Sequence, residues 1–168
     1  MTWFPPSLPQ GLVVSQTVAI INYIGRKAGM EGSDDASYAN SQMFIAEGED
    51  LYSGLLAHFA TTLGRACKCT DEARAAYWAE VVPKHFGCLE AMVTGTAAAG
   101  TKYTVGELYL FSMLHQMVLV GADMAKYPNL LGFYNGVQAH EATKKVLAGT
   151  SNMGVLRQYF VLEDPASN

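Results

Sequence analysis

The chain has 168 residues, about the length of one domain, and half of them are hydrophobic while 15% are charged. This composition is typical of a globular chain with a sizeable core and argues against disorder. The net charge is −4 and no run of Lys or Arg exists, so nucleic acid is excluded as an expected partner, because binding phosphates needs a basic face.

Membrane and secretion signals are missing from the sequence. No stretch reaches about 18 consecutive apolar residues, so no transmembrane helix and no membrane partner are expected. The first six residues lack the basic and apolar regions of a signal peptide. Three cysteines, an odd number, favour a reducing compartment. These features predict a cytoplasmic protein.

The first 15 residues differ in character from the rest of the chain. Pro5, Pro6 and Pro9 are followed by Gly11 and by a short apolar run over residues 12–14. Proline removes a backbone donor and glycine permits turns. We therefore expect an extended piece, a turn and one short strand.

Helical spacing of apolar residues begins at Val18 and continues through most of the chain. The pattern predicts helices over about residues 18–28, 35–63, 72–98, 105–120, 129–138 and 141–148. Pro83 predicts a kink in the third of these helices. Residues 155–161 of the tail are able to pack back on the body. One or two strands followed by about six helices predict a mainly α fold, a helical bundle.

The segment from Thr104 to Glu107 has the spacing of a helix capping box. The threonine hydroxyl can accept from the amide three residues on, and the glutamate can reach back to the first amide. The run that follows, over residues 108–120, is apolar almost all round. This pattern is typical of a central, buried helix.

Cys67 and Cys69 are separated by a single residue, Lys68. A metal or redox pair is one interpretation. Zinc and redox motifs favour two intervening residues, however, so a loop with two free thiols is favoured. No two histidines lie four residues apart, and no metal site is predicted.

Four local patterns follow one another along the chain. They are Pro6-Ser7-Leu8, then Ser15-Gln16-Thr17 opening a helix, then Glu49-Asp50-Leu51, then the capping box from Thr104 to Glu107. In this order and spacing they resemble the glutathione S-transferase family, nearest to its sigma, alpha and pi-like classes. In that family the corresponding segments are a cis-proline region, a Gln-Ser pair, an acidic motif at the dimer interface, and a capping box with Asp where this chain has Glu.

The resemblance implies a division of the chain into two parts. Residues 1–32 would be the remnant of a thioredoxin-like, glutathione-binding domain, and residues 33–168 a complete all-helical C-terminal domain. The family's first domain begins with a βαβ unit, which needs about 30 residues or more. Only 15 residues precede Gln16. We therefore expect a truncated first domain without the family's catalytic Tyr, Ser or Cys, and no catalytic residue is assigned.

The resemblance also implies which residues contact glutathione, which is expected as substrate. They are Pro6, Ser7, Leu8, Gln16, Thr17 and Asp50. Gln16 and Thr17 would hold the γ-glutamyl carboxylate, because a helix N-terminus favours an anion. Asp50 would reach across a homodimer to the glutathione amino group. From the residues alone, a plain helix cap and a solvated charge remain open alternatives.

Four side chains are candidates for a hydrophobic substrate pocket, with an ordinary core role as the alternative. They are Tyr103, Tyr109, Met113 and Tyr159. The resemblance implies conjugation of glutathione to small hydrophobic electrophiles, a detoxification reaction, with weak or no activity in the chain as given. A non-catalytic binding or assembly module, or the incomplete sequence of an ordinary transferase, are the alternatives.

Overall fold

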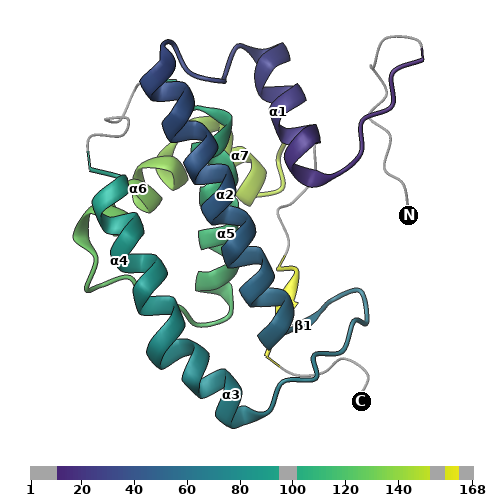
Figure 1. The fold of residues 1–168 in the computed structure, drawn as a ribbon, viewed down its shortest axis with the longest axis vertical. Helices are drawn as coiled ribbons and strands as arrows, with labels where there is room; N and C mark the ends of the chain where they lie inside the picture. Colours follow the sequence, from purple (N-terminus) through teal and green to yellow (C-terminus); the bar gives the residue numbers. More distant parts are fainter. Residues whose placement is uncertain (1–10, 95–101, 152–157, 163–168) are drawn as a thin grey trace.

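The computed structural model describes residues 11–94, 102–151 and 158–162. Pro6, Ser7 and Leu8, and the predicted end of the third helix near residue 98, lie outside the described residues. The described part is mainly helical, as predicted (Figure 1). Its elements, in chain order, are α1 (Thr17–Ala28), α2 (Asp35–His58), β1 (Ala60–Thr61), α3 (Asp71–Ala76), the π-helical segment η1 (Tyr77–Val81), α4 (Val82–Met92), α5 (Val105–Leu119), α6 (Pro128–Ala139), α7 (Glu141–Leu147) and β2 (Phe160–Val161).

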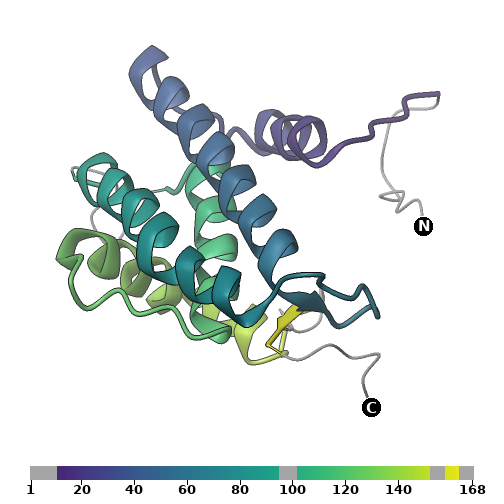
Figure 2. The ribbon, with the colours of Figure 1, turned by 60° about the horizontal axis from the view of Figure 1, so that its bottom comes forward.

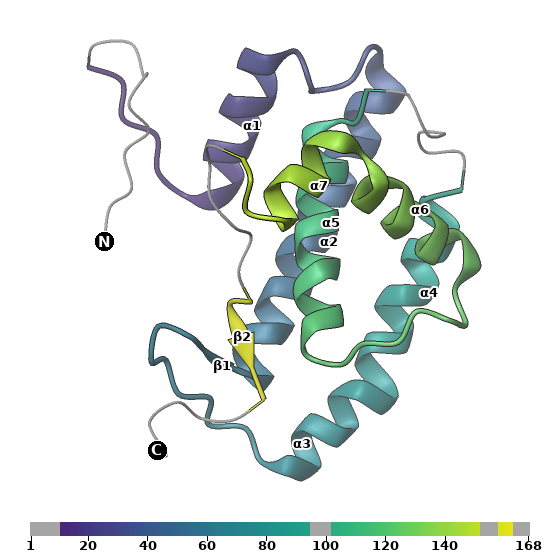
Figure 3. The ribbon, with the colours of Figure 1, turned by 180° about the vertical axis from the view of Figure 1, so that it is seen from behind.

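Helix α5 lies at the centre of the bundle. It packs against α2 on one side and against α6 on the other, as the opposite views of Figures 1 and 3 show. Leu110, Leu114 and Met117 on α5 are completely buried. The prediction of a central buried helix from an apolar run is therefore confirmed. None of the helices in the described ranges is both long and apolar enough to cross a membrane.

Two glycines let α2 and α5 approach each other closely. The amide of Gly106 at the start of α5 donates to Ser41 Oγ on α2 over 3.1 Å. A Cβ on Gly106 would lie 2.0 Å from the Ser41 carbonyl oxygen, and a Cβ on Gly48 would lie 2.8 Å from the Tyr109 ring. The absence of a side chain at Gly106 and at Gly48 thus sets how closely α2 and α5 approach each other.

Helix α1 packs on the start of α5 and projects from the bundle on the side away from α4 (Figure 2). It ends at Gly29, which adopts a left-handed conformation at φ 61°. Only Gly25 on this helix is buried, against Val105, and Val18 and Ile24 stay exposed. With Val18 and Ile24 exposed and Ile20 and Ile21 only partly buried, α1 contributes little to the core.

The predicted kink near Pro83 takes the form of a π-helical segment. Helix α3, η1 and α4 follow one another without a break. The π-helical segment η1 ends at Val81, and Pro83 is the second residue of α4. Proline has no amide hydrogen to donate and its ring crowds the carbonyl of the preceding turn. A locally widened helix accommodates both defects.

Two sequence-based expectations about extended chain need correction. The second helix ends at His58 rather than near residue 63, because Ala60 and Thr61 pair as β1 with β2 in an antiparallel ladder. Phe160 in β2 is buried, so the tail does pack back on the body.

The expected strand over residues 12–14 is not formed. Within the described ranges this segment has no strand to pair with, and Val13 is 67% exposed.

Candidate functional site

The N-terminus of α1 carries an unusual backbone conformation. Gln16 is the N-cap residue, with φ 75° and ψ 131°, and it is the one non-glycine residue with positive φ in the described part of the chain. A residue with a Cβ in this region stores about 1–3 kcal/mol of strain. Such strain persists where the surrounding structure imposes it, and strained residues concentrate at ligand sites.

Among the residues that the structure describes, no side chain caps the first-turn amides of α1. The Gln16 side chain makes no capping hydrogen bond, and no acidic residue lies in the first turn. Gln16 and Thr17 are both exposed. Free amides and the positive end of the helix dipole attract an anion to this position. A carboxylate is therefore the ligand group that this end of α1 fits best.

Asp50 lies on the outer face of α2, away from the α5 contact. It is exposed and belongs to a stripe of exposed positions three or four residues apart. The stripe consists of Met43, Ala46, Asp50, Ser53 and Ala57. We call it the α2 outer stripe. Small and apolar side chains at this spacing are typical of a helix that packs against another helix.

Two of the three predicted pocket tyrosines, Tyr109 and Tyr159, meet next to α2 through Tyr52. Tyr109 on α5 donates its hydroxyl to the Glu49 carboxylate on α2. Tyr52, one turn after Glu49, interacts with both Tyr109 and Tyr159 and stacks edge-on against Phe160 with ring centroids 5.9 Å apart. We call Glu49, Tyr52, Tyr109 and Tyr159 the tyrosine cluster.

Met113 lies beside the tyrosine cluster, one turn after Tyr109 and near Gly48. Tyr159, in the tail, is held in place by backbone hydrogen bonds to α5 and to the residue after β1. Its amide donates to Gln116 Oε1 over 2.7 Å, and its carbonyl accepts from the Thr62 amide over 2.8 Å. The structure therefore brings together three of the four predicted pocket residues, from α5 and from the tail.

Burial raises the pKa of two hydroxyls in the tyrosine cluster, which are neutral at physiological pH even at their ordinary pKa. It raises the pKa of Tyr109 far above its ordinary value, and the hydrogen bond to Glu49 raises that pKa further. Burial, followed by the neighbouring Tyr159, raises the pKa of Tyr52. Both hydroxyls are therefore neutral at physiological pH and act as hydrogen-bond donors, not as bases.

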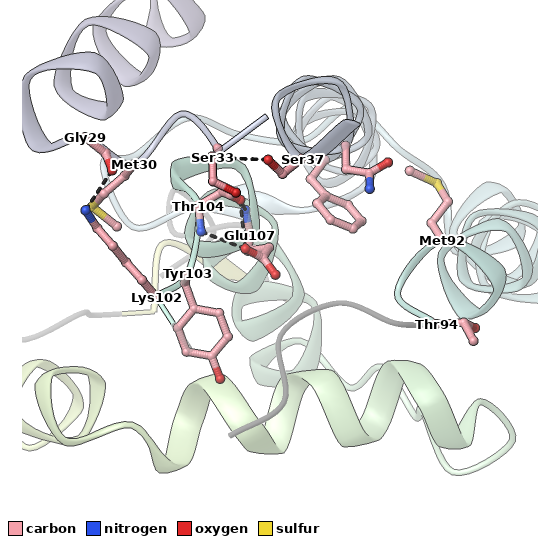
Figure 4. Close-up of a pocket in the computed structure, with 13 residues that line it drawn as sticks. Gly29, Met30, Ser33, Ser37, Met92, Thr94, Lys102, Tyr103, Thr104 and Glu107 are labelled. Atoms are coloured by element: carbon pink, nitrogen blue, oxygen red, sulfur yellow. Dashed lines mark hydrogen bonds between the residues drawn. The ribbon is translucent and has the colours of Figure 1, made fainter. Parts of the chain in front are cut away.

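A cavity of about 540 Å³ lies elsewhere, where the segment between α1 and α2 meets the start of α5 (Figure 4). Tyr103, the remaining predicted pocket residue, lines this cavity and packs edge-on against His140 with centroids 5.8 Å apart. Gly29 also lines it, at the opposite end of α1 from Gln16. Since α1 has 12 residues and a helix rises about 1.5 Å per residue, roughly 18 Å separates the cavity from the strained N-terminus.

The polar groups around the cavity are engaged in holding helix ends. Lys102 Nζ donates to the carbonyls of Ala28 and Gly29 over 3.3 and 2.7 Å. Glu107 Oε2 accepts from the Thr104 amide over 2.6 Å and from its hydroxyl over 2.8 Å, which completes the capping box predicted from the sequence. These bonds are structural, so the cavity is a junction of three helix ends.

Sequence inspection missed Glu49 and Tyr52 as members of the tyrosine cluster. Both flank the Asp50 position, and a tyrosine three residues after a glutamate on one helix face is a signal that could have been read. No group of three or more metal-ligating side chains occurs among the residues that the structure describes.

The helices pack around a buried α5 that begins with a capping box, which defines an all-helical domain. A family model, "Glutathione S-transferase, C-terminal domain", matches residues 57–149, which is more than half of the chain. The chain therefore belongs to the glutathione S-transferase family.

A solved structure supports the fold assignment independently. The sigma-class glutathione S-transferase of Fasciola hepatica superimposes with a TM-score of 0.65 and 21% sequence identity, covering 83% of this chain and 67% of that chain. At this identity the similarity shows a shared fold. A search of curated protein sequences gave no significant match.

Proposed function

We propose that this protein binds glutathione by its γ-glutamyl end at the N-terminus of α1, as part of a glutathione transferase-type function. The observation that carries the proposal is the strained backbone of Gln16 at a helix end whose amides are not capped by any side chain in the described ranges. In a member of the glutathione S-transferase family, the expected anion at this position is the γ-glutamyl carboxylate.

The strain at Gln16 has a physical use in this proposal. Holding a non-glycine residue at positive φ costs about 1–3 kcal/mol. The fixed backbone conformation gives the backbone and the amide side chain of Gln16 one defined direction. A preorganised donor set loses less entropy when a ligand binds. The contributions of Pro6, Ser7 and Leu8 to the same ligand remain predictions, since these residues lie outside the described ranges.

The α2 outer stripe supports a homodimer as the functional form. Met43 is 47% exposed on this stripe, and Asp50 lies one heptad, about two helical turns, further along the same face. In a dimer formed by this stripe and by the neighbouring helix α4, Asp50 of one copy would face the second copy. Its carboxylate would then pair with the ammonium of glutathione bound there.

The tyrosine cluster is the proposed site for the electrophilic substrate. Its rings and Met113 offer an apolar surface, while the Tyr109 hydroxyl is already donated to Glu49. These features suit a small hydrophobic molecule. Tyr103, in the separate cavity, has no role in this site.

The proposed roles concern binding and positioning. Interactions that hold the substrate and the transition state equally do not raise turnover. None of the described residues is assigned the activation of the glutathione thiol, which requires a donor within about 2.6–3.2 Å of the sulfur. We therefore expect the chain to bind glutathione and to conjugate it slowly at most.

The test compares Gln16→Gly with Gln16→Ala on a glutathione-affinity resin. Glycine relieves the backbone strain and removes the side chain, so Gln16→Gly should keep or raise the thermal midpoint while it loses retention. Gln138→Ala, on α6 instead of α1, is the matched control and should be retained like the wild type. Undiminished retention of both Gln16 variants would contradict the proposal.

A further inference from the structure

The loop between β1 and α3 brings two sulfur atoms together. The amide of Cys69 donates to Cys67 Sγ over 3.1 Å, and Cys67 Sγ lies 3.7 Å from the Ala57 carbonyl oxygen. Cys69 Sγ lies 3.2 Å from the Thr70 carbonyl oxygen. Both thiols are free and partly exposed.

The backbone geometry of this loop allows the two sulfurs to join. A disulfide needs Cα atoms about 4.4–6.8 Å apart. Two residues of fully extended chain span at most about 7 Å. The contact between Cys67 Sγ and the Cys69 amide shows that the side chain of Cys67 folds over the backbone of Cys69. Rotation of the Cys69 side chain away from Thr70 would then direct its sulfur toward Cys67.

The surroundings give the two thiols different roles. Cys67 Sγ receives a backbone donor, which favours attack by this sulfur. Burial, and then the neighbouring Cys67 thiol, raise the pKa of Cys69, while the Arg74 guanidinium opposes the rise. Once Cys67 is capped in a mixed disulfide, its thiol no longer contributes to that rise. The contact between the Cys69 amide and Cys67 Sγ places Cys69 beside that sulfur, in a position to act second.

We propose that Cys67 and Cys69 form a redox-active dithiol that exchanges with small-molecule disulfides, glutathione disulfide being the test oxidant. The Cys67 thiolate attacks one sulfur of the oxidant, forms a mixed disulfide and releases one glutathione thiolate, which takes up the proton that Cys67 gave to solvent. The Cys69 thiolate then attacks Cys67 Sγ, forms the intramolecular disulfide and releases the second glutathione. Two protein thiols are oxidised and one disulfide is reduced, a transfer of two electrons.

This inference is independent of the proposed glutathione site at α1. It rests on the Cys67-Lys68-Cys69 motif, for which the sequence alone favoured two unconnected thiols. The third cysteine, Cys88, is exposed on α4 and supplies an internal reference, because a lone exposed thiol can form only a mixed disulfide or a link between chains.

The test treats the reduced full chain with glutathione disulfide, blocks remaining thiols with an alkylating reagent and measures intact and peptide masses. The wild-type peptide that carries Cys67 and Cys69 should lose two hydrogens, with the two residues joined, and the same peptide of Cys88→Ser should behave identically. Cys67→Ser should leave Cys69 mostly alkylated, and Cys69→Ser should accumulate a stable glutathione adduct on Cys67.

Several results would overturn the proposal. One is a wild type in which Cys67 and Cys69 are both alkylated after the treatment. Others are a wild type that carries a separate glutathione on each of these residues, or one in which they link two chains on a non-reducing gel. Serine keeps the size and shape of cysteine at this exposed loop, and the thermal midpoint of each variant reports whether it is folded.

Discussion

Replacing Gly106 by alanine tests the packing that places α5 against α2. An added Cβ would lie 2.0 Å from the carbonyl oxygen of Ser41, 2.7 Å from its carbonyl carbon and 2.8 Å from its Cα. All three atoms belong to the α2 backbone, so no side-chain rotation relieves the contact. The two helices must separate by more than about 1 Å to restore ordinary van der Waals distances.

The magnitude follows from three contributions. Overpacking of a well-packed core costs about 1–3 kcal/mol, and a clash with backbone belongs to the upper half of that range. Separation of the helices also weakens the hydrogen bond from Gly106 to Ser41 Oγ, which contributes about 0.5–1.5 kcal/mol. The better helix propensity of alanine returns at most about 1 kcal/mol, and less in the first turn, where Gly106 lies. We expect a net loss of about 2–4 kcal/mol.

Chemical denaturation followed by circular dichroism measures this loss. Gly87→Ala is the matched control, because Gly87 lies inside α4 with open space around its missing Cβ. This control should gain about 0.5–1 kcal/mol from propensity alone. A Gly106→Ala protein as stable as the wild type, with an unchanged denaturant slope, would refute the close-packing argument.

Three further predictions test the capping box, a buried histidine and the dimer. Thr104→Ala removes a hydrogen-bonded N-cap and should lower the free energy of unfolding by about 0.5–2 kcal/mol in a urea titration; an unchanged midpoint would show that Thr104 does not cap α5. Burial lowers the pKa of His115 below its ordinary 6.5, so the unfolded chain takes up this proton first and stability should fall as pH drops below 6.5; His115→Gln should show a smaller fall between pH 7 and pH 5, and an equal fall would exclude His115 as the cause. Met43→Lys should dissociate the dimer in sedimentation experiments while Leu63→Lys, at a loop position 79% exposed, should not; equal behaviour of the two would place the interface elsewhere.

The helices could be predicted because their signals are local. Thr104 and Glu107 form the expected capping box, Pro128 opens α6 and Gly29 ends α1 in a left-handed conformation. Each signal acts within one turn of the chain, so it is legible in a single sequence.

The strand pair and the end of α2 could not be predicted for the opposite reason. Ala60 and Thr61 pair with residues 160 and 161, about a hundred positions away, and nothing local specifies that partner. Phe59 is buried in the extended conformation, so its apolar character was equally compatible with a longer helix.

In the candidate site, too, the sequence could indicate which residues matter but not how they are arranged in space. The family resemblance implied a ligand role for Gln16, but its positive φ is a backbone property that side-chain identity does not report. Glu49 and Tyr52 join Tyr109 through the register of α2 on α5, which two close glycine contacts determine. Tyr103 lies before α5 begins, so the path of a loop decides which way it faces.

The central claim is that the N-terminus of α1 binds the γ-glutamyl end of glutathione. Calorimetric titration of the wild-type chain with glutathione, and separately with cysteinylglycine, which lacks that end, tests it most directly. We predict saturable binding of glutathione that is at least about tenfold tighter than that of cysteinylglycine, a difference of about 1.4 kcal/mol. Equal affinities for the two peptides, or no saturable binding of glutathione, would contradict the claim.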